Sequence, residues 1–148
     1  MSIVIPAVLV PSRAALDETL ARLEGLFDVV QVDIVDGKFA GPPTWPYAEP
    51  SELSVVQGET QFPSLGRFKF EVDLMVENPE DVVGKWIEAG VARPLVHIES
   101  VRDFPKLLAD LKENYGHEKG FAEDLLSLGV ALNIDTDTAV LEPYIDSI

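Results

Sequence analysis

Apolar residues along the chain fall alternately into short continuous runs and into stretches with helical spacing. The run IVIPAVLV, residues 3–10, is typical of a buried strand. Ser12 follows it in the sequence, and serine is a residue type that favours helix N-caps. The next stretch carries leucines at i, i+4 and i+7, namely Leu16, Leu20 and Leu23. A second apolar run, DVVQVDIVD, spans residues 28–36. The start of the chain therefore predicts strand, helix, strand.

The same alternation continues to the end of the chain. Further strands are predicted over residues 68–76 (FKFEVDLMV), 94–100 (PLVHIES) and 129–135 (GVALNID). Helical spacing follows each of them, which predicts helices that start at Asn78-Pro79 and span 104–115, 121–127 and 140–145. The proline-rich segment 41–67 predicts a loop around one short helix near residues 51–57.

Strands rich in Val, Ile and Leu, each followed by an amphipathic helix, are typical of a parallel sheet covered by helices. The sequence thus predicts one α/β domain over residues 1–148 with five strand–helix units. Polar residues gather where the predicted strands end, namely Asp33, Asp36, Asp73, His97, Glu99, Asn133 and Asp135. Because ligands bind at the carboxyl ends of parallel strands, we expect a site at this edge of the sheet.

The negative net charge argues against several classes of binding partner. Twenty-six acidic residues against eleven basic ones give a formal charge of -15, so neither nucleic acid nor an anionic membrane is an expected partner. A sugar phosphate would need a local basic or backbone-amide site, and Lys38, Arg67 and Lys69 are the only bases between Arg22 and Lys85. The absence of cysteine excludes disulfides, thiolate metal sites and cysteine nucleophiles. Lacking a long apolar run or a signal-peptide pattern, the chain is expected to be soluble and cytoplasmic.

Several sequence phrases occur together in one order: IPAVLV, VDIVDGKF followed by GPP, EVDLMVENPE, LVHIES and GVALN. In this order and spacing they resemble the ribulose-phosphate 3-epimerase family over most of the chain, and VDIVDG and DLMVENPE are the most specific of them. The resemblance implies a (β/α)8 barrel enzyme that interconverts D-ribulose 5-phosphate and D-xylulose 5-phosphate through proton transfer at C3. It also implies two acid/base carboxylates on opposite faces of the substrate and a divalent metal, Mn, Fe, Zn or Mg, that stabilises the enediolate.

The resemblance assigns roles to individual positions. Asp33 corresponds to a strand-two aspartate that is both a metal ligand and an acid/base. Gln31 and Asp73 stand where the family has histidine ligands, so the metal set carried over is Gln31, Asp33 and Asp73. The positions that correspond to residues lining the substrate pocket are Ala7, Met75 and His97. With two imidazole ligands replaced, the resemblance implies weak or absent metal binding and little or no epimerase activity for a lone chain.

The residues themselves leave alternatives open at these positions. Asp33 and Asp73 are either two solvated strand-end acids or an altered metal or ligand site with oxygen ligands. If they face each other without a cation, each resists the ionisation of the other. His97 is either a structural, hydrogen-bonded histidine or a ligand. Asp36 followed by Gly37 predicts a turn in which the aspartate accepts hydrogen bonds from nearby backbone amides.

Length sets a further expectation. A closed barrel of eight strand–helix units usually needs about 200 to 250 residues, and 148 residues hold five units. Leaving roughly 1,000 Å² of inner apolar surface wet would forfeit about 25 kcal/mol, more than the typical net stability of about 5 to 15 kcal/mol. We therefore expect a partial (β/α)8 TIM-type barrel that forms an obligate homodimer or higher homo-oligomer. The alternatives are an active epimerase completed by a second, complementary chain and a non-catalytic interaction module.

Overall fold

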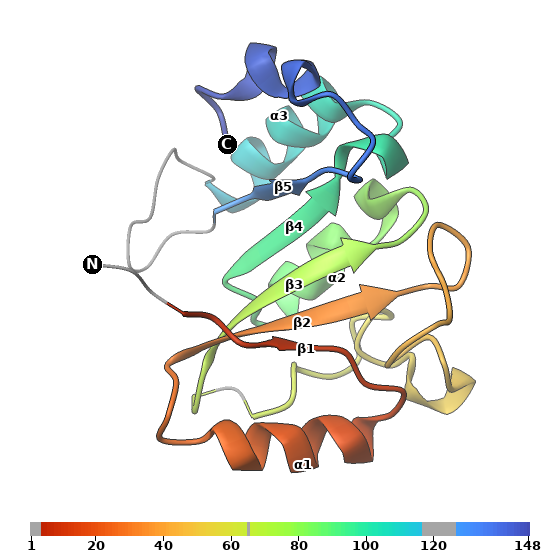
Figure 1. The fold of residues 1–148 in the computed structure, drawn as a ribbon, viewed down its shortest axis with the longest axis vertical. Helices are drawn as coiled ribbons and strands as arrows, with labels where there is room; N and C mark the ends of the chain where they lie inside the picture. Colours follow the sequence, from red (N-terminus) through yellow and green to blue (C-terminus); the bar gives the residue numbers. More distant parts are fainter. Residues whose placement is uncertain (1–3, 65, 117–126) are drawn as a thin grey trace.

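The computed structural model describes residues 4–64, 66–116 and 127–148, and places five strands in one parallel sheet (Figure 1). The strands are β1 (Ala7–Val8), β2 (Val29–Val35), β3 (Lys69–Met75), β4 (Arg93–His97) and β5 (Gly129–Ala131). They lie side by side in chain order, and each pair is parallel. The predicted α/β class is confirmed, and the arrangement is that of a partial TIM-type fold.

Helices connect successive strands. The α-helices are α1 (Arg13–Leu23), α2 (Val83–Glu88) and α3 (Phe104–Tyr115), and shorter 3-10 segments are η1 (Pro50–Glu52), η2 (Pro79–Asp81), η3 (Ile98–Ser100) and η4 (Thr138–Tyr144). In Figure 1, α2 lies behind β3 and β4, while α1 and α3 flank the two ends of the sheet. Within the described ranges, no helix has the length and apolar character needed to cross a membrane.

Side-chain alternation along the central strands separates an apolar face from a polar one. The apolar members are at most 1% exposed and comprise Val30, Val32, Ile34, Phe70, Val72 and Leu74. They form one core with helix residues Leu16, Trp86 and Leu107. The intervening residues, Gln31 and Asp33 on β2 and Glu71 and Asp73 on β3, belong to the opposite face, which we call the polar face of the sheet.

Several predicted strand bounds are wrong. The strand predicted over 3–10 is only Ala7–Val8 in the described residues, where Pro6 and Pro11 flank it and supply no amide donors. The strand predicted to run to Ser100 ends at His97, because the chain turns into η3 and the Ser100 hydroxyl donates to the His97 carbonyl at 2.9 Å. The last strand ends at Ala131 rather than at residue 135.

Helix starts and types also differ from the predictions. Asn78 adopts a left-handed φ of 52° and makes no capping bond, so η2 forms first and α2 begins only at Val83. The short helix predicted near 51–57 is the single 3-10 turn η1. The final helix is the 3-10 segment η4, where Pro143 lacks the amide that an α-helix requires. The helix predicted over 121–127 lies almost wholly outside the described residues.

Candidate functional site

The carboxyl ends of β2, β3 and β4 bring Asp33, Asp73 and His97 together on the polar face. Asp33 is paired with Asp73 in the parallel register of β2 and β3. His97 Nε2 lies 3.4 Å from Asp73 Oδ1. Gln31, two residues before Asp33 on the same strand, donates from Nε2 to Asp33 Oδ1 at 2.8 Å. We call these four residues, Gln31, Asp33, Asp73 and His97, the strand-end cluster.

Asp33 is a half-buried carboxyl with an altered acidity. Burial raises the pKa of Asp33, the hydrogen bond from Gln31 acts to lower it, and the negative charge of Asp73 raises it further. The net result is a pKa above the ordinary aspartate value. A carboxylate with a raised pKa is a stronger proton acceptor than an ordinary aspartate.

His97 is 8% exposed and lies between two carboxylates. Its Nε2 faces Asp73, and its Nδ1 is 3.7 Å from Glu99 Oε2. These are ion-pair distances, and neither ring nitrogen has a hydrogen-bond partner of good geometry. The contact with Asp73 raises the pKa of His97 against the opposing effect of burial, and the charges of Asp73 and Glu99 add to the increase. His97 therefore forms ion pairs with Asp73 and Glu99 when its ring is protonated.

Glu99 connects the end of β4 to the segment after β5. Its Oε1 accepts a hydrogen bond of 2.7 Å from the Asn133 amide and another from the Thr136 hydroxyl. Partial burial acts to raise the pKa of Glu99, but these hydrogen bonds outweigh it and leave the pKa lowered. The Glu99 carboxylate therefore stays charged beside His97.

The loop after β2 reaches the cluster through one aromatic side chain. The predicted Asp36–Gly37 turn is confirmed, because Asp36 Oδ1 accepts from the amides of Lys38 at 2.8 Å and Phe39 at 3.0 Å. The Phe39 ring lies 5.2 Å from the His97 ring, measured between centroids. Sequence reasoning did not identify Phe39 as a site residue, although it lies within the VDIVDGKF phrase that pointed to the family.

Residues 3–148 match the family model described as the ribulose-phosphate 3 epimerase family. The chain belongs to the ribulose-phosphate 3-epimerase family. Over 114 residues it is 28% identical to the ribulose-phosphate 3-epimerase of Aquifex aeolicus (strain VF5), an alignment that covers 76% of this chain and 47% of that protein. The chain thus spans about half the length of this relative. The resemblance predicted from VDIVDG and DLMVENPE is confirmed.

The other positions carried over from the epimerase family lie at different depths around the cluster. Ala7 is exposed on β1 and is in register with Gln31 of β2. Met75 is the last residue of β3, two residues beyond Asp73, and is partly buried. Both therefore share the polar face with the cluster. Their roles toward a substrate stay predictions.

The family-implied metal does not fit the side chains as they are arranged. Among residues 4–64, 66–116 and 127–148, no group of three His, Asp or Glu side chains could hold a metal ion. Gln31 turns its amide nitrogen toward Asp33 rather than an oxygen toward a cation. Asp73 is engaged by His97. The predicted ligand set Gln31, Asp33 and Asp73 is thus occupied by contacts within the protein.

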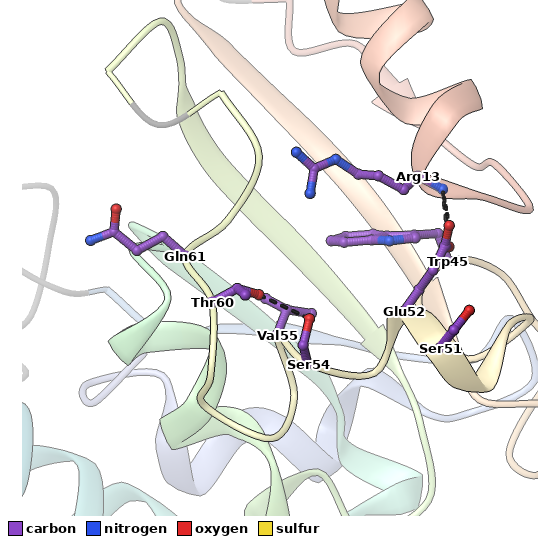
Figure 2. Close-up of a pocket in the computed structure, with 8 residues that line it drawn as sticks. All are labelled: Arg13, Trp45, Ser51, Glu52, Ser54, Val55, Thr60 and Gln61. Carbon is purple, nitrogen blue, oxygen red and sulfur yellow. Dashed lines mark hydrogen bonds between the residues drawn. The ribbon is translucent and has the colours of Figure 1, made fainter.

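A pocket of about 190 Å³ lies between the start of α1 and the segment after β2 (Figure 2). It is lined by Arg13, Trp45, Ser51, Glu52, Ser54, Val55, Thr60 and Gln61. The Glu52 carboxylate accepts from the Arg13 amide at 3.0 and 3.2 Å and so caps α1 together with Ser12, as predicted for Ser12. Trp45 is 2% exposed and packs edge-on against Phe62 and Trp86, so its role is core packing. The pocket contains none of the predicted site residues.

Proposed function

We propose that the strand-end cluster binds a pentose 5-phosphate and supplies one of the two proton-transferring groups of an epimerase, so that the chain alone has little or no epimerase activity. The pairing of Asp33 with Asp73 on neighbouring strands carries this proposal. Epimerisation removes a proton from one face of a carbon and returns it to the other, which requires groups on opposite faces. Two carboxyls from neighbouring strands of one sheet approach a ligand from the same side.

The residues of the cluster have distinct tasks in this proposal. Asp33 accepts the C3 proton, and its raised pKa increases its strength as a base. Gln31 holds Asp33 Oδ1 in place through its hydrogen bond. When protonated, His97 places positive charge near the anion that forms when the proton leaves. With a single base, C3 receives a proton or a solvent deuteron on the same face from which the original proton was removed.

The test is incubation of the chain with D-ribulose 5-phosphate in D₂O, followed by NMR and by a coupled assay for D-xylulose 5-phosphate. We expect slow deuterium incorporation at C3 with little or no xylulose 5-phosphate. Asp33→Asn abolishes the exchange. Asp28→Asn is the matched control, because Asp28 is an exposed aspartate just before the opposite end of β2.

Two results would contradict this function. One is rapid formation of xylulose 5-phosphate by the lone chain, with or without added Mn²⁺, Fe²⁺, Zn²⁺ or Mg²⁺, and its loss in Asp33→Asn. The other is no exchange at all, or exchange that Asp33→Asn leaves unchanged. The first would show a complete epimerase site, and the second would remove Asp33 as the base.

We also propose that the chain forms a homodimer or higher homo-oligomer through the two edges of its sheet. In the described sheet β1 and β5 each pair with one neighbour, which leaves their outer backbone groups available for another strand. The large hydrophobic residues that are exposed near β1 are Val4 and Leu9, and those that follow β5 are Ile134, Val140 and Ile145. A second copy placed with its β1 beside β5 would continue the parallel order and cover these side chains.

Light scattering at micromolar concentration tests the assembly. We expect a mass of at least twice the 16.2 kDa of one chain. Combining Leu9→Lys with Ile134→Lys, at side chains 59% and 99% exposed, should yield monomers without disturbing the core. Leu26→Lys is the control, because Leu26 is 71% exposed but lies between α1 and β2 rather than at a sheet edge. A folded wild-type monomer would overturn the proposal.

A further inference from the structure

The carboxylate of Asp36 joins two segments that are far apart in the chain. Its Oδ1 accepts from the amides of Lys38 and Phe39, within the loop that follows β2. Its Oδ2 accepts from the amide of Glu77, just after β3, at 2.8 Å. Since one carboxylate makes all three bonds, the position of the β2 loop depends directly on the end of β3.

The far end of this loop is fixed by Thr44, which is 4% exposed. The Thr44 hydroxyl donates to the Asp33 carbonyl at 3.0 Å and accepts from the Val35 amide at 2.9 Å. The Thr44 amide donates to the Val35 carbonyl at 3.0 Å. Between these anchors, Gly37 has a φ of 80°, a conformation that favours glycine and turns the chain back over the sheet.

The anchored loop carries Phe39 across the sheet. Phe39 follows β2, yet its ring packs on His97 of β4, with an interplanar angle of 54°. In the sheet order β2 and β4 are separated by β3, so this contact spans a strand. Two bonds link Asp36 to the end of β3: its carboxylate accepts from the Glu77 amide, and its backbone amide donates to the Met75 carbonyl at 3.4 Å.

We propose that Asp36 is a positioning residue: by bridging the amides of Phe39 and Glu77 it holds the Phe39 ring against His97 of the strand-end cluster. The task requires an acid, because a carboxylate offers two acceptor oxygens and an amide side chain offers one. The inference rests on the proposed function only in treating this cluster as a site. The Phe39–His97 contact itself can be measured without any substrate.

Proton NMR of the histidine rings tests the bridge. The chain has two histidines, so His117→Gln assigns the Cε1–H signal of His97. At one pH on the low-pH plateau, Asp36→Asn should move this signal toward its position in Phe39→Leu, where the ring current of Phe39 is lost. Asp36→Ser, which can keep a turn acceptor but is too short to reach Glu77, should give the same loss. Glu77→Gln retains the backbone amide and should leave the signal unchanged.

Two outcomes would overturn the inference. In one, Phe39→Leu moves the His97 signal while Asp36→Asn and Asp36→Ser do not, which would show that the loop holds its place without the bridge. In the other, Phe39→Leu leaves the signal unchanged, which would show that the rings are not in contact. Neither outcome depends on deuterium exchange into ribulose 5-phosphate, so the Asp36 bridge and the proposed function can fail independently.

Discussion

Asp33 and Asp73 face each other across β2 and β3, paired in the parallel register of the sheet. Each carboxyl has its own compensating partner, the Gln31 amide for Asp33 and the His97 ring for Asp73. The cluster is therefore divided into two neighbouring pairs within the protein. Each contact offsets part of the repulsion between the two acids in this partly buried site.

The first prediction concerns the acidity of Asp33. Burial is the largest cause of its raised pKa, and the charge of Asp73 adds to it. Asp73→Asn should therefore lower the pKa of Asp33 but leave it above the ordinary value. Gln31→Leu removes a hydrogen bond to the charged form and should raise it. Carboxyl-carbon NMR titration measures both changes, and shifts of the same sign in the two variants would contradict this account.

The second prediction is a pH dependence of stability through His97. Its pKa is raised in the folded protein above the ordinary value of 6.5. A raised histidine pKa contributes stability that is fully present below about pH 6.5 and is lost as the pH rises through the folded value. The stability difference between wild type and His97→Gln should thus be largest below pH 6.5 and shrink above it. Urea unfolding at fixed chain concentration checks this, and a pH-independent difference would count against the ion pairs.

The strand-end cluster could be predicted from sequence because strand ends are a local pattern. The alternation of Val30, Val32 and Ile34 around Gln31 and Asp33 already separates the two faces of β2. Once the strands are parallel, the carboxyl ends of β2, β3 and β4 lie at one edge, so Asp33, Asp73 and His97 must be neighbours.

The loop after β2 and the helix starts could not be predicted in the same way. The contact between Phe39 and His97 depends on the bond from Asp36 to the Glu77 amide, 41 residues later, which leaves no periodic signal. Asn78 shows the opposite case, since its capping propensity is strong locally but its left-handed backbone delays α2 to Val83. Tertiary contacts override local propensity at these positions.

The third prediction concerns Trp86, which is fully buried where α2 packs against the sheet. Trp86→Ala should lower the free energy of unfolding by about 3 to 5 kcal/mol, because it removes a large side chain and leaves a cavity. The indole nitrogen makes no hydrogen bond in the described structure. Trp86→Phe therefore loses no polar contact and should cost much less. Equal losses in the two variants, measured by circular dichroism in urea, would show that the indole ring has a further role.

The fourth prediction concerns the polar face one layer below the cluster, where Glu71 and Arg93 form an ion pair across β3 and β4. Glu71 is 4% exposed, and burial lowers the pKa of Arg93. Arg93→Met leaves a buried carboxylate without its cation, which should cost about 3 to 5 kcal/mol. The double variant Arg93→Met with Glu71→Leu also removes the unpaired carboxylate and should recover most of the lost stability. Urea unfolding of the single and double variants at one chain concentration measures both changes in stability. A double variant as unstable as Arg93→Met would show that the polar face requires the ion pair itself.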